Sequence, residues 1–118
     1  MPEPTFVQTF GTGTVRLASG AAAPSSGLFI PDSALQAAGL ANPSTATAEG
    51  HLVAVTINAQ NYLSQANFDS NIDQSLIIAK GFSSFTTRGT DNTEYRQDQI
   101  TLSLTKIDGG ATIDPDDY

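Results

Sequence analysis

The alternation of apolar and polar residues is strongest near the C-terminal end of the chain. Within residues 95–107, Ile100, Leu102 and Leu104 alternate with threonine and serine. Successive side chains of a strand point to opposite faces of a sheet, so this pattern predicts a strand with one hydrated face and one buried face. We therefore expect Ile100, Leu102 and Leu104 to contribute to the hydrophobic core.

A second apolar run predicts the partner of this strand. Residues 75–80 form a short strand-like run, and residues 82–87 extend it beyond Gly81, where we expect a β-bulge. The residues between the two strands, 88–93, are rich in Gly, Asp and Asn, which favour turns. The pattern predicts an antiparallel hairpin with a long connection.

Weaker patterns occupy the middle of the chain. The β-branched run at residues 52–57 predicts a buried strand, and residues 59–71 predict a long, partly ordered loop. Residues 31–39 offer Asp32 or Ser33 as a helix cap at their front and glycine at their end. These signals predict one short helix in this segment.

The two ends of the chain are expected to be extended. Residues 5–10 and 14–17 are β-like runs around two glycines, whereas residues 108–118 combine chain breakers with carboxylates. The sequence as a whole predicts a mostly β fold, a small antiparallel sheet or sandwich with one short helix, long loops and extended termini. The expected organisation is an extended N-terminal arm or edge strands at 1–20, a single β-rich domain at 21–107 and an irregular acidic tail at 108–118.

The composition narrows the classes of function. Hydrophobic residues make up 39% of the 118 residues and charged residues only 14%, against about 25% charged in an average domain. The apolar runs fall far short of the roughly 20 residues that span a bilayer, so we expect a soluble protein with no membrane partner. The net charge of −7 opposes binding to nucleic acid, because Lys and Arg supply that attraction. The absence of cysteine excludes disulfides, thiolate metal sites and thiol catalysis.

The residues that carry metal or acid–base chemistry do not form a complete motif. Asp69, Asn71 and Asp73 have the alternating oxygen ligands that open a calcium loop, but Gln74 stands where that loop needs glycine and Lys80 where it needs a closing carboxylate. We therefore predict no metal site and no cofactor.

The only histidine, His51, precedes the run at 52–57 without a nucleophile motif beside it. We interpret it as a strand-edge histidine whose ring is hydrogen-bonded to backbone. No catalytic residue is predicted, and we expect that the protein is not an enzyme.

The C-terminal half resembles a group of short acidic proteins of cyanobacteria and their tailed phages. The resemblance lies in the Asn-Ile-Asp-Gln-Ser run at 71–75, the Gly-Phe-Ser-Ser-Phe-Thr-Thr-Arg-Gly run at 81–89, the Tyr-Arg pair at 95–96 and the closing Ile-Asp-Pro-Asp-Asp-Tyr run at 113–118. It implies a structural virion component, either a capsid cement or decoration protein or its prophage-derived copy. A cement protein stabilises the shell by bridging neighbouring capsid subunits.

This resemblance sets the expected partners and location. The expected partners are the major capsid protein and copies of the chain itself, in the virion after a soluble stage in the host cytoplasm. Phe6, Val7, Phe10 and Tyr118 are the expected partner-binding residues, because apolar side chains on extended ends are hard for a small monomer to bury. The alternative hypothesis is a small, soluble, β-rich binding module for an unknown ligand.

Overall fold

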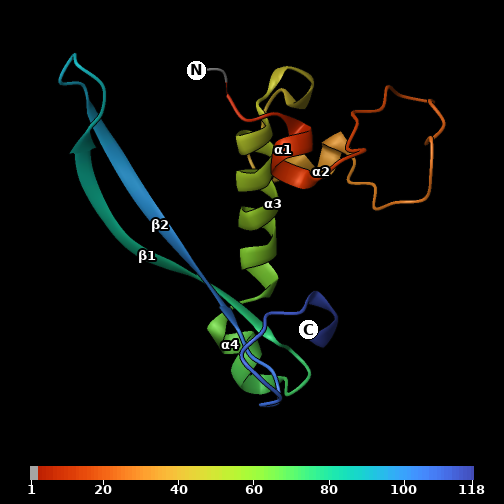
Figure 1. Cartoon of the computed structure of the whole chain (residues 1–118), viewed down its shortest axis with the longest axis vertical. Coiled ribbons are helices and arrows are strands. Elements are labelled where there is room, and N and C mark those ends of the chain that lie inside the picture. The colour runs from red at the N-terminus through yellow and green to blue at the C-terminus, as the bar shows by residue number, and fades with distance from the viewer. Residues whose placement is uncertain (1–2) are drawn as a thin grey trace. The chain divides into compact units, whose positions relative to one another are not determined.

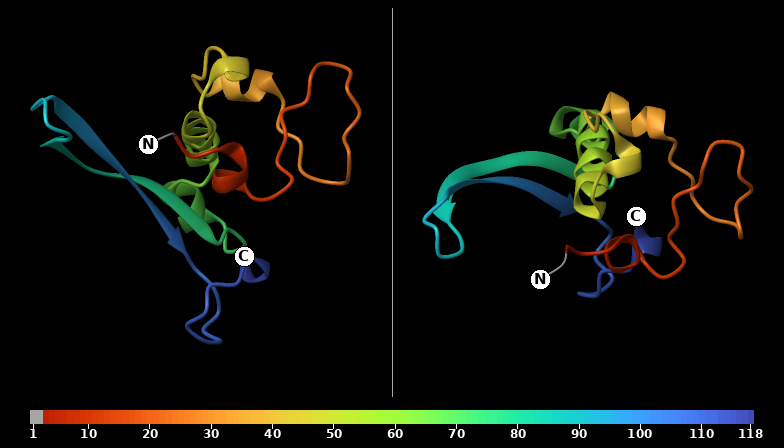
Figure 2. Two further views of the ribbon diagram at one scale, coloured as in Figure 1. Left: turned by 45° about the horizontal axis from the view of Figure 1, so that its top comes forward. Right: turned by 90° about the horizontal axis from the view of Figure 1, so that it is seen from above.

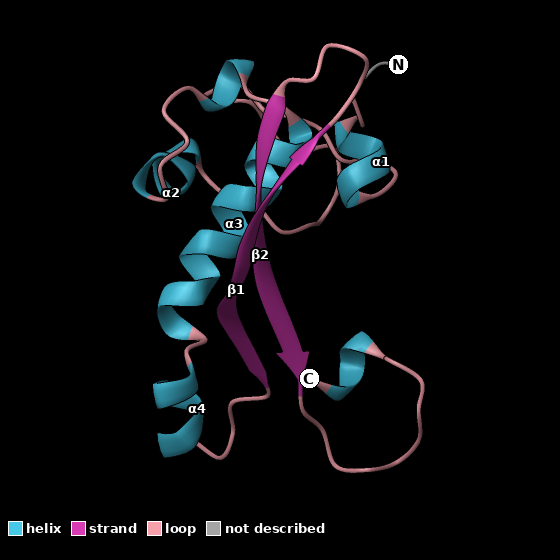
Figure 3. Cartoon of the chain, turned by 90° about the vertical axis from the view of Figure 1, so that its left-hand side faces the viewer, coloured by secondary structure: helices cyan, strands magenta, loops and turns pink. Residues whose placement is uncertain are grey.

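The computed structural model describes residues 3–118, which divide into two compact units, one ending at Asn58 and the other beginning at Ala59. The chain is a small mixed α/β protein with a two-stranded antiparallel sheet (Figures 1 and 3). It contains more helix than the mostly β fold that the sequence predicts. The boundary between the units falls inside the range 21–107 that the sequence pattern treats as one domain.

The N-terminal segment begins with a short helix, α1 (Phe6–Phe10), where a β-like run was expected. Thr5 explains the difference, because its side chain accepts a hydrogen bond from the backbone N–H of Gln8 at 3.1 Å. The Gln8 side chain in turn accepts from the backbone N–H of Thr5 at 2.9 Å. This capping box satisfies two N–H groups that a helix start otherwise leaves free, and it makes the edge-strand interpretation of this run wrong.

The next segment is irregular as far as the second helix, α2 (Asp32–Ala37). The expected strand at 14–17 does not form, and residues 18–30 make an open loop that projects from the helices of this unit (Figure 2). The helix predicted at 31–39 is confirmed. Gly39, with φ at +110°, follows its end, a conformation that residues with a Cβ rarely adopt.

The long helix α3 (Ala48–Tyr62) replaces the buried strand expected at 52–57. Thr47 precedes it and accepts a hydrogen bond from the N–H of Gly50 on its side chain, in the manner of a helix cap. A helix satisfies its backbone within its own segment, whereas a strand at this place would need neighbouring strands to pair with. The β-branched composition therefore gave the wrong prediction here.

The face that α3 buries is made of small residues. Ala48, His51 and Ala54 recur every three positions and are buried, and Leu35 of α2 is buried as well. A short 3₁₀ turn, η1 (Pro43–Thr45), lies between the two helices and buries Pro43. The core of the first unit thus holds little apolar volume.

The second unit begins at the C-terminal end of α3 and continues into α4 (Gln65–Ser70). A helix therefore occupies part of the range 59–71 that was expected to be a loop. The Ser64 side chain caps α4 by accepting from the N–H of Asn67 at 3.1 Å. The Gln74 side-chain amide donates to the carbonyls of Ser64 at 3.1 Å and Leu76 at 2.8 Å, which ties the start of α4 to the start of the sheet.

Strands β1 (Leu76–Thr87) and β2 (Glu94–Leu104) form the predicted antiparallel hairpin, which twists along its length (Figures 1 and 2). The register shifts between Lys80 and Ser83, because Gly81 and Phe82 lie opposite the single residue Gln99. The bulge predicted at Gly81 is therefore confirmed. Beyond it, the even-numbered residues of β2 pair with odd-numbered residues of β1.

The apolar face of β2 is not part of a core within this chain. Ile78 of β1 is buried, and its N–H donates to the carbonyl of Leu63 at 2.8 Å. Leu102, directly opposite Ile78, is 51% exposed, and Ile100 and Leu104 are 42% and 38% exposed. The expectation that these three residues are buried is wrong, because the described chain supplies cover for β1 only.

The C-terminal segment is mostly irregular and ends in a 3₁₀ turn, η2 (Pro115–Asp117). Lys106 holds this segment by donating to the Thr112 carbonyl at 2.6 Å and to the Asp117 carboxylate at 3.2 Å. The acidic tail is thus folded back onto the end of the hairpin.

The bulge makes a stability prediction at Gly81. A Cβ at this position would lie 3.0 Å from Cβ of Gln99 and 3.3 Å from its carbonyl oxygen, so Gly81→Ala should destabilise the hairpin by about 1 to 3 kcal/mol. Gln99→Gly should remove part of that cost in the double variant. Hydrogen exchange of the hairpin amides measures the loss of stability. Gly109→Ala is the control, because a Cβ at Gly109 would have its nearest neighbour 3.9 Å away. Equal protection in Gly81→Ala and Gly109→Ala would contradict the bulge geometry.

Candidate functional site

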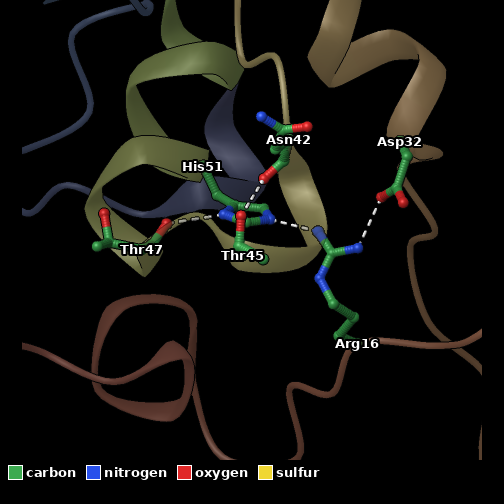
Figure 4. A network of polar contacts seen from close by, with 6 residues as sticks. All are labelled: Arg16, Asp32, Asn42, Thr45, Thr47 and His51. Atoms are coloured by element: carbon green, nitrogen blue, oxygen red, sulfur yellow. Dashed lines mark hydrogen bonds and ion pairs between the residues drawn. The ribbon is translucent and has the colours of Figure 1, made fainter.

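The most enclosed polar group of the first unit is His51 (Figure 4). Its Nδ1 lies 2.7 Å from the Thr47 carbonyl oxygen, one helical turn earlier. The capping position of Thr47 fixes that carbonyl at the start of α3. Because a carbonyl oxygen can only accept, Nδ1 carries the hydrogen, and Nε2 of a neutral ring is left as an acceptor.

Arg16 uses that acceptor and links three segments of the unit. Its Nη2 donates to Nε2 of His51, and its Nη1 lies 2.8 Å from Oδ1 of Asp32 at the start of α2 (Figure 4). The Arg16 side chain is 29% exposed and that of Asp32 52%. The guanidinium therefore fastens the irregular segment around Arg16 to α2 and α3.

This geometry does not suit acid–base catalysis. Both ring nitrogens of His51 are engaged, one by a backbone carbonyl and the other by a guanidinium that carries a positive charge. A general base needs a free nitrogen within hydrogen-bond reach of the proton it removes. The arrangement can position chain segments, and the backbone contact agrees with the predicted role of His51, although the residue lies in a helix rather than at a strand edge.

The expected partner-binding residues lie in different surroundings. The Phe6 ring stands edge-on to the His51 ring with centroids 4.7 Å apart, and it stacks on Phe10 at 6.3 Å. Val7 and Phe10 are 46% and 41% exposed, so they remain open to a partner. Tyr118 lies in the second unit, where it is half-buried at the end of η2. Phe6 and Phe10 are thus brought together, with Val7 beside them in the chain.

A groove of about 660 Å³ opens beside these residues within the first unit. Its apolar lining includes Phe6, Phe10, Leu17, Phe29 and Leu35, with Arg16 and His51 at its polar part. The sequence pattern did not predict the loop residues of this lining. Their signal is the run Leu28-Phe29-Ile30, three large apolar residues in an otherwise small and polar loop.

The oxygen ligands considered for calcium are used within their own loop. Asp69 accepts from the Gln65 side chain at 2.8 Å, and Asn71 accepts from the N–H of Asp73 at 3.1 Å. Within residues 3–118, no group of three or more His, Cys, Asp or Glu side chains is placed to hold a metal ion.

A second polar network lies on the hairpin, beyond the bulge. The Asp98 carboxylate accepts from the Ser83 hydroxyl at 2.7 Å and from Nε of Arg96 at 2.9 Å. These hydrogen bonds, together with the charges of Arg96 and Lys80, hold the pKa of Asp98 below its usual range. The Arg96 guanidinium also lies over the Phe85 ring at 5.9 Å, so this end of the hairpin is ordered by polar contacts.

Comparison of the chain with protein-family models, curated proteins and solved structures finds no match. None of the helices described between residues 3 and 118 has the length and apolar character needed to cross a membrane.

The Arg16 network predicts a coupling between two residues distant in the chain. Arg16→Met should destabilise the protein by about 1.5 to 3 kcal/mol, because Asp32 and buried His51 lose a charged donor. In a double-mutant cycle with His51→Phe, followed by urea denaturation, the double variant should lose less stability than the sum of the losses in the two single variants. Arg88→Met, on the exposed connection of the hairpin, is the control. Simple additivity would show that the contact does not stabilise the unit.

The hairpin network predicts a pH effect at one carboxylate. Because the pKa of Asp98 is lowered in the folded state, its ionised carboxylate stabilises the hairpin at pH values above the ordinary carboxyl pKa. This stabilisation is lost as the pH falls through the lowered pKa and the carboxylate becomes protonated. Ser83→Ala and Arg96→Gln should each raise the pKa of Asp98, as followed by its carboxyl resonance in an NMR titration. Gln97→Ala, on the other face of the hairpin, should leave it unchanged. An unchanged pKa in both test variants would contradict the network.

Proposed function

We propose that the chain is a structural virion component, a capsid cement or decoration protein that stabilises a shell by bridging neighbouring capsid subunits. It acts by adhesion and is not an enzyme. Its partners are the major capsid protein and copies of itself, and its working location is the capsid.

The observation that carries this proposal is the surface left exposed by the chain. The accessible surface is 9285 Å² for a mass of 12.3 kDa. A compact protein of this mass exposes about 6,100 Å², and two separate compact bodies of half the mass expose about 7,300 Å² together. The excess over even the second value is about 2,000 Å², which is more than the roughly 800 Å² that each partner covers in a standard interface.

The exposed surface carries large apolar side chains in both units. Leu52 and Val53 of α3 are 46% and 52% exposed. Leu28 and Ile107 are exposed by 90% and 95%. Apolar surface of this extent is typical of proteins that complete their packing against another chain.

The chemistry of the surface favours a protein partner over other macromolecules. The chain has five basic and twelve acidic residues, and this excess of negative charge repels a polyanion. Ser, Thr, Asn and Gln side chains beside exposed apolar ones suit the rim and centre of a protein interface. The resemblance of the C-terminal half to short acidic proteins of cyanobacteria and their tailed phages favours a shell as that partner.

The first unit offers a defined place for attachment. Val7 and Phe10 present apolar surface on α1, and the adjoining groove of about 660 Å³ can accept an apolar side chain of a capsid subunit. Phe6 has the different task of supporting α1 against His51. Attachment and folding therefore depend on different residues of the same short helix.

The test is attachment to a shell that lacks the protein. Empty shells of the phage or prophage that encodes the chain are mixed with purified protein and sedimented. The variant with both Val7→Ser and Phe10→Ser should bind at least about tenfold more weakly, because truncating central apolar anchors removes much of the binding energy of an interface. Circular dichroism of the free variant should match that of the unchanged protein.

Gln36→Ser, on the exposed side of α2, is the matched control and should attach normally. Failure of the unchanged protein to bind the shells would contradict the cement function. Normal binding by the double variant would instead show that α1 is not the attachment surface.

A further inference from the structure

The outer edge of β2 has no backbone partner in the part of the chain that the structure describes. The sheet there consists of β1 and β2, so the 11 residues of β2 have a neighbour on one side only. The N–H of Ile78 points away from β2, since it donates to Leu63. In an antiparallel ladder the opposite residue also points outward, so Leu102 presents its backbone N–H and C=O at the free edge, as do Ile100 and Leu104.

This edge lacks the protection that edge strands usually have. Lysine, proline or a bulge normally prevents a free strand from pairing with another chain. From Gln99 to Thr105 the chain contains none of these, and its alternate side chains are the exposed Ile100, Leu102 and Leu104. The bulge of the hairpin lies on β1, which leaves the backbone of β2 regular.

We infer that β2 pairs antiparallel with β2 of a second copy of this chain. The product is a continuous four-stranded sheet in the order β1-β2-β2-β1, with a two-fold axis at Leu102. The inference deepens the proposed function and rests on it, because it names one of the contacts by which the protein assembles.

The sequence of β2 selects this register. With the axis at Leu102, that residue faces its own copy, and Ile100 faces Leu104 of the other chain. Apolar residues then oppose apolar residues, which are pairs that stabilise adjacent strands. An axis at Gln99, the middle of the strand, would instead place Arg96 against Leu102.

The charge of the hairpin fits a second copy as the partner. The chain carries a net charge of −7, but the hairpin from Leu76 to Leu104 is neutral. Its three basic residues are Lys80, Arg88 and Arg96, and its three acidic residues are Asp91, Glu94 and Asp98. Two copies repel each other least when they meet at the hairpin.

The exposed area of the chain is also large enough for an interface between two copies. A standard interface covers about 800 Å² on each partner. The excess surface of the chain, about 2,000 Å², therefore accommodates one such contact with a second copy and leaves surface for a shell.

Sedimentation analysis of the full chain at micromolar concentrations is the first measurement. We expect a dimer with twice the 12.3 kDa mass of one chain. Leu102→Lys and Leu102→Glu should each be folded monomers, since two like charges would meet at the axis. An equimolar mixture of the two variants should restore a dimer that contains one of each. A monomeric unchanged protein, or variants that remain dimers when separate, would overturn the inference.

The register is tested by cross-linking, which is simple because the chain has no cysteine of its own. Under mild oxidation Leu102→Cys should form a covalent dimer with itself. Ile100→Cys should do so only when mixed with Leu104→Cys, and Thr90→Cys, on the connection of the hairpin, should form no covalent dimer. Cross-linking of Thr90→Cys alone, or none at Leu102→Cys, would contradict the proposed pairing.

These outcomes are separable from those of the shell experiment. Leu102→Lys that binds shells as a monomer would leave the cement function standing and show that the dimer is a separate contact. A dimer that cross-links at Leu102→Cys but does not bind shells would support the pairing and contradict the cement function.

Discussion

The amount of apolar surface that each unit can remove from water limits the whole structure. Burial of apolar area is the main favourable contribution to folding, and it must offset the entropy lost when the chain is ordered. In residues 3–118 the buried hydrophobic side chains are few, chiefly Leu35, Ala48 and Ala54 in the first unit and Ile78 in the second. Two of these are alanines, which bury little area. Polar contacts within the chain therefore contribute a larger share of the stabilisation than they would beside a larger core.

Polar side chains supply this stabilisation by joining segments of the chain that hydrophobic packing does not hold together. His51 and Arg16 connect the irregular N-terminal segment to helices, Gln74 connects α4 to β1, and Lys106 folds the tail onto the hairpin. Each hydrogen bond adds only about 1 kcal/mol net, but it fixes a direction that apolar contacts alone would leave free. The molecule therefore has a defined backbone course in regions where its core is thin.

The elements that the sequence predicts well are those whose signals are local. The hairpin follows from alternation on both sides of a turn-forming segment, and Gly81 marks the bulge because a Cβ at this position would lie only 3.0 Å from Cβ of Gln99. The helices α1 and α3 were missed although Thr5 and Thr47 occupy capping positions, since β-branched neighbours favoured a strand. The pairing of Arg16 with His51, 35 positions apart, has no sequence signal at all.

The burial of β2 could not be predicted for a different reason. Alternation shows that one face of a strand differs from the other, but it does not show whether the cover belongs to the same chain. Ile78 and Leu102 lie opposite each other on one face, yet only Ile78 is covered within the molecule. The pattern is the same for a strand buried in the core and for a strand at an interface, so alternation alone predicted a core strand here.

The bulge between Lys80 and Ser83 also affects how the surface of the hairpin can change. Because two residues of β1 oppose one of β2 there, the residues beyond the bulge have exchanged sides relative to those before it. Deletion of one codon at Gly81 or Phe82 would return β1 to regular pairing without shortening β2. Such a chain would keep the pairs of Leu76 to Lys80 with β2 and those of Ser83 with Asp98 and Phe85 with Arg96, and only the extra residue at the bulge would be lost. The side chains of the two halves of the hairpin can thus change almost independently in evolution. The half before the bulge carries an apolar surface, and the half beyond it carries a charged one.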